Sequence, residues 1–101
     1  MRDDSFRDYV LDQLDAGAGI TAKGMFGGHG LYRGKKFFGI VFRGKLYFKA
    51  DEKARAFYVA KGMKPFRPSA KQTLKNYYEV PEDMLENPEE LLKLAREAAR
   101  I

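Results

Sequence analysis

The chain offers few side chains that could carry out catalysis. Its 101 residues include one histidine, His29, and no cysteine. Catalysis needs a nucleophile, a metal or an acid–base pair that titrates near neutrality, and His29 has no second imidazole with which to hold a metal. None of the Ser and Thr hydroxyls lies in a nucleophile elbow: Ser5, Thr21, Ser69 and Thr73. We therefore expect no catalytic residue, no metal site and no cofactor.

Glycines surround the histidine in the pattern Gly28-His-Gly-Leu-Tyr-Arg-Gly34. The spacing differs by one residue from the dinucleotide-binding fingerprint, and the residues that follow are typical of a strand rather than a helix. The segment also lacks the Gly-Lys-Ser/Thr of a P-loop. We interpret it as a glycine loop that forms a bulge or a tight turn between strands, and not as a phosphate site.

Positive charge is concentrated in the middle of the chain. The net charge is +5, from 19 basic and 14 acidic side chains, yet residues 16–78 hold fourteen basic and two acidic ones. The two ends are acidic. This asymmetry indicates either a polyanionic partner or two faces of opposite charge that attract each other, within one molecule or between copies. The alternative is that the lysines only keep sheet edges soluble.

Many of these basic side chains are interleaved with aromatic ones, such as Tyr32, Phe38 and Tyr47. Basic groups beside exposed rings can contact phosphates while the rings stack on bases. Alternatively, the rings belong to the core. No helix-turn-helix, zinc-finger or RNA-recognition signature is present. The basic residues that we select as candidates for contact with nucleic acid or another partner are Lys23, Arg33, Lys35, Lys36, Arg43, Lys45, Lys49, Arg67, Lys71 and Lys75.

These candidates must be positioned by the predicted elements. An amphipathic helix is expected over 3–15 and a strand over 20–26. The near-copies 32–38 and 42–48 each place a glycine after an arginine, which predicts two hairpin turns and a β-meander. Residues 37–42 are apolar on both faces of the pleat. They predict a central strand covered by helices on one face and by a partner on the other.

The second half of the chain predicts a helix capped by Asp51, a short strand near 63–66 and a basic loop over 68–73. A strand over 74–80 would place Leu74, Asn76 and Tyr78 on one face, and a helix follows from Pro88. We therefore predict an α+β fold in one domain, residues 1–101. It is a two-layer sandwich with an antiparallel sheet of five to six strands and N-terminal, central and C-terminal helices. No apolar run is long enough to span a membrane, so we expect a cytoplasmic protein.

Four motifs, in this order, resemble the N-terminal domain of the TfoX/Sxy bacterial competence regulators: Met25-Phe-Gly-Gly-His-Gly-Leu-Tyr32, Leu46-Tyr-Phe-Lys-Ala-Asp51, Gly62-Met-Lys-Pro-Phe66 and Tyr77-Tyr-Glu-Val-Pro81. The resemblance covers residues 6–100. It implies a bacterial α+β domain linked to transcriptional regulation of DNA uptake, alongside a cyclic-AMP receptor protein. The family has no agreed catalytic residues, so the resemblance assigns none to this sequence. The full regulators have a second, helical domain, for which this sequence has no room, so we expect a stand-alone copy.

The motif residues that we interpret as determinants of turns and core are Met25, Phe26, Gly27, Gly28, Gly30, Tyr77, Tyr78 and Pro81. The leading hypothesis is a non-enzymatic regulatory or interaction module whose partner is DNA or a transcription-regulator protein. The second is a homodimer without direct DNA contact, in which the acidic ends of one copy meet the basic middle of another. The third is a small-molecule enzyme with His29 as its acid–base group.

Overall fold

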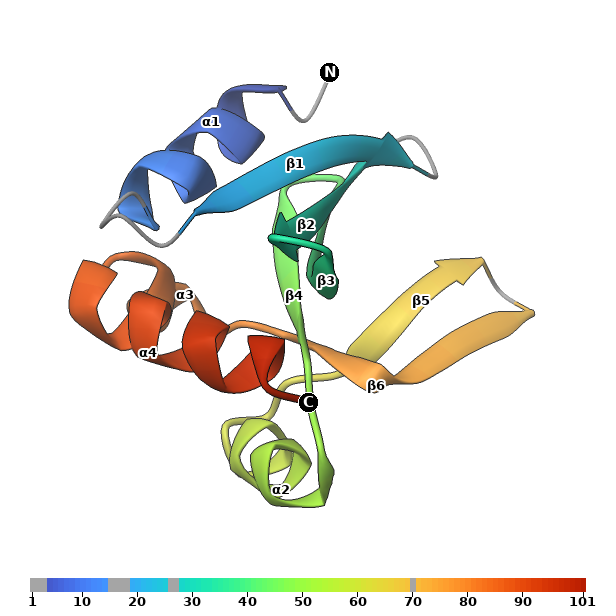
Figure 1. The fold of residues 1–101 in the computed structure, drawn as a ribbon. Coiled ribbons are helices and arrows are strands. Elements are labelled where there is room, and N and C mark those ends of the chain that lie inside the picture. The colour runs from blue at the N-terminus through green and yellow to red at the C-terminus, as the bar shows by residue number, and fades with distance from the viewer. Residues whose placement is uncertain (1–3, 15–18, 26–27, 70) are drawn as a thin grey trace.

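The computed structural model describes residues 4–14, 19–25, 28–69 and 71–101. The elements in chain order are α1 (Asp4–Gln13), β1 (Ile20–Met25), β2 (Gly28–Arg33), β3 (Lys36–Phe42), β4 (Lys45–Lys49), α2 (Glu52–Ala60), β5 (Pro65–Ser69), β6 (Gln72–Glu79), α3 (Glu82–Leu85) and α4 (Pro88–Ala99). The strands form one antiparallel sheet in the order β1-β2-β3-β4-β6-β5 (Figure 1). The predicted α+β fold is confirmed. Within the described residues, no helix is long and apolar enough to cross a membrane.

Two tight turns produce the predicted meander. Gly34 and Gly44 have φ angles of +62° and +76°, and Arg43 adopts a φ of +50°. Two-residue hairpin turns need such left-handed residues, because their twist matches that of the flanking strands. The near-copies of the sequence thus become the β2–β3 and β3–β4 hairpins.

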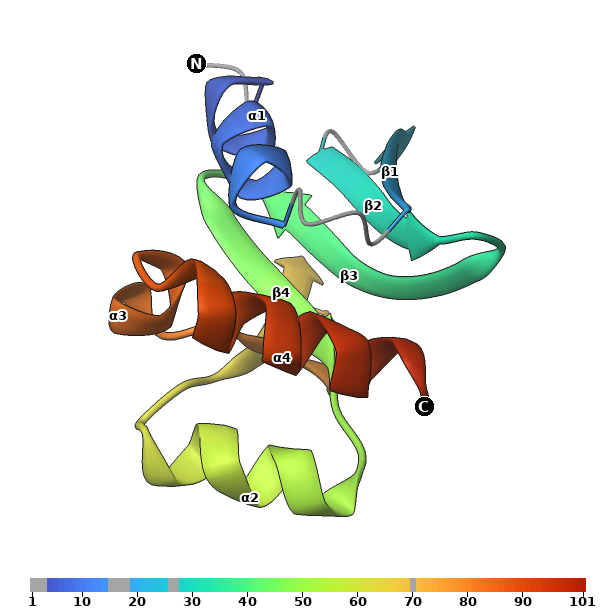
Figure 2. The ribbon, with the colours of Figure 1, turned by 60° about the vertical axis from the view of Figure 1, so that its left-hand side comes forward.

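The main core lies between the helices and one face of the sheet. Helix α4 crosses strands β3 and β4 (Figure 2) and buries Leu91, Ala95 and Ala98 against them. The other fully buried members of this core include Val10, Leu14, Leu31, Phe38, Leu46, Phe48, Tyr58 and Val80. Side-chain caps begin two of the helices: Asp51 accepts a hydrogen bond from the Ala54 N–H at 2.9 Å, and Asn87 accepts one from the Glu90 N–H at 3.3 Å.

A second, smaller core occupies the opposite face of the sheet and consists of Ile40, Phe42, Tyr47 and Phe66. The Phe66 ring of β5 lies 5.3 Å from the Phe42 ring of β3 and 4.8 Å from the Tyr47 ring of β4. Strands β4 and β6 lie between β3 and β5 in the sheet. Contact between the rings of β3 and β5 therefore requires the sheet to curl. The cover that we expected from a partner on this face of β3 is therefore supplied by the protein's own curled sheet.

Register shifts decide which side chains face this second core. Between β2 and β3, Leu31 pairs with Gly39 but Tyr32 pairs with Phe37, so Phe38 is the extra residue of a bulge. A Cβ at Gly39 would lie 3.1 Å from both the Phe48 ring and the Tyr47 carbonyl oxygen, which explains the glycine.

A second shift, between β5 and β6, brings Leu74 into the cluster of Phe66 and Tyr77, whereas Tyr78 faces the helices. The predicted alternation that placed Leu74 and Tyr78 on one face is therefore wrong. The predicted loop over 68–73 is a hairpin, in which β5 ends at Ser69 and β6 begins at Gln72.

Candidate nucleic-acid interface

A row of three half-buried rings crosses the helix-free face of the sheet. Tyr32 of β2 and Phe37 of β3 are cross-strand partners whose ring centroids are 5.2 Å apart, and Tyr77 of β6 lies 5.5 Å from Phe37. Adjacent ring planes are tilted by 39° and 37°. Burial, followed by the neighbouring Tyr32, raises the pKa of Tyr77 above its ordinary value, so this hydroxyl stays neutral. We call Tyr32, Phe37 and Tyr77 the aromatic strip.

Two lysines lie directly beside the aromatic strip. The ammonium of Lys23, on β1, lies over the Tyr32 ring at 5.2 Å from its centroid, which is a cation–π contact. Lys49, the last residue of β4, is the cross-strand partner of Tyr77. In the described part of the chain, neither lysine has a carboxylate within 4.0 Å. Among the described residues, no carboxylate competes with an anionic ligand for either ammonium group.

Two basic hairpin ends lie farther out along the strands. The β2–β3 turn, which projects from the sheet in Figure 2, carries three exposed cationic residues directly after Tyr32 and before Phe37: Arg33, Lys35 and Lys36. The β5–β6 hairpin projects away from the helices in Figure 1 and carries three more: Arg67, Lys71 and Lys75. The aromatic strip thus lies on β2 and β3, which the first turn connects, and on β6, which begins at the second turn.

The remaining two basic candidates lie elsewhere. Arg43 and Lys45 lie at the β3–β4 turn, at the end of β3 opposite to the β2–β3 turn. The Lys45 ammonium lies 3.8 Å from a carboxylate oxygen of Glu79. Eight of the ten candidates therefore lie beside the aromatic strip, at the β2–β3 turn or on the β5–β6 hairpin, and the other two lie at the β3–β4 turn.

Sequence reasoning identified only part of the aromatic surface. Of the three rings between which the sequence left surface and core open, Tyr32 lies on this surface, Phe38 is fully buried against the helices and Tyr47 is in the second core. Burial, then the charge of Glu79, raises the pKa of Tyr47. The sequence pattern does not single out Phe37, and it marks Tyr77 only as a motif residue. Gly39 is the signal that could have revealed Phe37, because a glycine within a strand often marks a bulge. The bulge, whose extra residue is Phe38, changes which of the neighbouring rings faces the helices.

His29 lies within strand β2 and not in a glycine loop, which corrects the sequence interpretation. Its Nε2 atom lies 3.1 Å from a guanidinium nitrogen of Arg7, on α1. Guanidinium groups only donate, so Nε2 is the acceptor and the imidazole proton is on Nδ1. This contact links α1 to the sheet. Within the described residues, no three His, Cys, Asp or Glu side chains lie close enough together to hold a metal.

The described motif residues lie mostly in the interior. Gly28, Gly30 and Pro81 are buried, and the Tyr78 ring stacks on Tyr58 at 6.1 Å with an interplanar angle of 7°. Met25 ends β1, and its side chain lies outside the described part of the structure. Phe26 and Gly27 lie outside the described residues.

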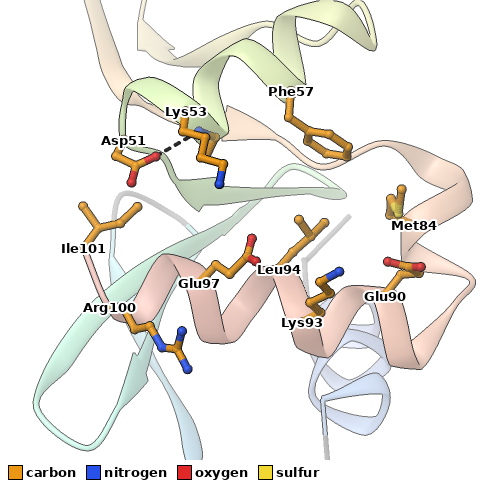
Figure 3. Close-up of a pocket in the computed structure, with 11 residues that line it drawn as sticks. Asp51, Lys53, Phe57, Met84, Glu90, Lys93, Leu94, Glu97, Arg100 and Ile101 are labelled. Atoms are coloured by element: carbon orange, nitrogen blue, oxygen red, sulfur yellow. Dashed lines mark hydrogen bonds between the residues drawn. The ribbon is translucent and has the colours of Figure 1, made fainter.

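A groove of about 530 Å³ separates α2 from α4 on the helical side of the molecule (Figure 3). Phe57 of α2 and Leu94 of α4 point into it, and Met84 lies near one end. Its other lining side chains include three acidic and three basic ones: Asp51, Glu90, Glu97, Lys53, Lys93 and Arg100. The groove therefore combines an apolar floor with a rim of mixed charge, which suits a protein surface better than a polyanion.

Comparisons with known proteins support the resemblance seen in the sequence. A search of the curated proteins found no match. The family model described as the TfoX N-terminal domain matches residues 12–101, which span every strand and three of the four helices named above. The chain belongs to the TfoX N-terminal domain family.

Proposed function

We propose that this protein is a non-enzymatic regulatory module of bacterial competence that contacts nucleic acid through the helix-free face of its sheet, in the cytoplasm. The observation that carries the proposal is the aromatic strip with its two lysines and two basic hairpin ends. Kinship with the TfoX N-terminal domain supports the regulatory role. Lysines and arginines that contact phosphates release counterions, and this release favours binding at low salt.

The test is fluorescence anisotropy with a labelled DNA duplex, titrated at several salt concentrations. We expect the affinity to fall by about tenfold or more between about 50 and 200 mM salt. The double variant Lys35→Glu, Lys36→Glu should weaken binding and reduce the salt dependence. Its matched control is Lys61→Glu, Lys64→Glu, which makes the same change in net charge at exposed positions outside this surface. Absence of binding at low salt both to the duplex and to a single strand of the same length, or equal losses in both double variants, would contradict the proposal.

A second candidate function is protein–protein interaction without direct nucleic-acid contact, and the groove between α2 and α4 favours it. The occupant that we consider is a second copy of the chain, because the mixed charges of the rim suit a surface that carries both signs. Light scattering at several salt concentrations tests this candidate. A monomer at every concentration and salt condition would eliminate it.

A further inference from the structure

We propose that the aromatic strip binds an unpaired stretch of nucleic acid, with bases against its rings and phosphates on the lysines beside it. This inference rests on the proposed function and specifies the state of the nucleic acid that the surface recognises.

The spacing of the rings favours a single strand over a duplex. Adjacent ring centroids in the aromatic strip are 5.2 Å and 5.5 Å apart. Stacked bases in a duplex are about 3.4 Å apart, and each covers the faces of its neighbours. Bases that meet successive rings must therefore be separated from one another. An unpaired strand permits this separation, and every base has a face that can pack on an aromatic ring.

The lysines are placed to hold the phosphates of such a strand. Lys23 lies on β1 and Lys49 on β4, three strands away in the sheet, or about 14 Å at the usual strand separation. Tyr32 and Phe37 are on the two strands between them, and Tyr77 is on the strand beyond Lys49. A nucleic-acid strand that crosses the sheet over these rings would meet an ammonium group near each end of its path. The Lys23 ammonium, which lies over the Tyr32 ring, would move from the ring to a phosphate when a base packs there.

Chain composition provides a direct spectroscopic signal. The protein contains six tyrosines and no tryptophan, so its intrinsic fluorescence comes from tyrosine. Two of the three rings of the aromatic strip are tyrosines. Bases that stack on them should quench this fluorescence, whereas phosphate contacts at the hairpin ends alone should leave it nearly unchanged.

The experiment measures anisotropy and tyrosine fluorescence with oligothymidine, oligouridine and a DNA duplex of equal length. The single strands should bind about tenfold more tightly than the duplex at the same salt concentration. Tyr32→Leu keeps an apolar side chain but removes the ring, and it should weaken single-strand binding by about tenfold while leaving duplex binding unchanged. Tyr32→Phe keeps the ring and should bind as the unmodified protein does. The control Tyr9→Leu removes an exposed ring on α1 and should have no effect on binding.

The outcomes separate this inference from the proposed function. A duplex that binds as tightly as the single strands, or a Tyr32→Leu variant that binds single strands normally, would overturn the inference and leave the proposed function standing. Equal losses in Tyr32→Phe and Tyr32→Leu would also overturn it, because stacking does not need the hydroxyl. Absence of binding to all three probes at low salt would overturn both. Preference for one of the two single strands supports the inference and identifies the sugar that the site favours.

Discussion

Replacement of Gly28 by alanine should destabilise the protein far more than the same replacement at Gly24, on the neighbouring strand. A Cβ at Gly28 would collide with the carbonyl oxygen of Val41 and lie 3.1 Å from the Cα of Phe42. Both atoms belong to the backbone of β3, so a change of side-chain rotamer cannot relieve the clash. At Gly24 the nearest atom would be the carbonyl oxygen of Gly28 at 4.0 Å, which is an ordinary contact.

The expected magnitudes follow from these distances. Overpacking that moves the backbone costs about 1–3 kcal/mol, and a strand that shifts also weakens hydrogen bonds worth about 1 kcal/mol each. We therefore expect Gly28→Ala to lower the free energy of unfolding by about 3 kcal/mol, from a total of roughly 5–15 kcal/mol. Gly24→Ala should be neutral or stabilise by up to about 1 kcal/mol, because alanine loses less backbone entropy on folding.

Urea denaturation followed by circular dichroism measures both variants. With a slope of about 1–3 kcal/mol per molar urea, the midpoint of Gly28→Ala should fall by about 1–3 M at an unchanged slope, while that of Gly24→Ala stays the same or rises. Equal midpoints for the two variants would refute the reasoning. The pairing that places Gly28 against Phe42 would then be wrong, and the glycine run would have to be interpreted as an open loop.

Two further predictions concern the second core and the buried tyrosines. Phe66→Ala removes the fully buried ring that holds β5 over β3 and β4, and should lower the free energy of unfolding by about 3–5 kcal/mol, with faster hydrogen exchange in β5 and β6. A loss below about 1 kcal/mol would show that the curled sheet does not depend on this ring. Burial, then the charge of Glu97, raises the pKa of Tyr58 in the folded protein. The contribution of Tyr58 to the free energy of unfolding is therefore fully present below the unfolded pKa near 10 and is lost as the pH rises above that value. Urea midpoints should therefore fall from about pH 9 to about pH 11, one unit either side of that value, and they should fall less steeply for Tyr58→Phe. Identical slopes against pH for the two proteins would contradict this assignment.

Local sequence signals were sufficient to predict the order of the main elements. The Arg-Gly repeats determine the meander, because positive φ angles at Gly34 and Gly44 produce two successive hairpins. Asp51 marks the start of α2 through a cap that involves only residues three positions apart. The curl of the sheet could not be predicted in the same way. It depends on contacts between Phe66 and Phe42, which are 24 positions apart and lie on strands that are not neighbours in the sheet.

The candidate surface shows the same division between local and long-range causes. Strict alternation along β3 would place Phe37 and Gly39 on one face, and the bulge at Phe38 breaks this rule by putting Phe38 and Gly39 toward the helices. The aromatic strip therefore exists because of one extra residue in one strand.

The separation of the basic residues, in contrast, follows from the meander alone. A strand of a meander has its two turns at opposite ends, so Lys35 and Arg43, which flank β3, cannot share one end of the sheet. Strand β3 has seven residues, which extend over about 23 Å. A ligand bound to the aromatic strip and the β2–β3 turn would need to follow the whole length of β3 to reach Arg43. Substitution of Arg43 or Lys45 should therefore change the affinity for a short oligonucleotide much less than substitution of Lys35 or Lys36, although all four residues lie within one basic segment of the sequence.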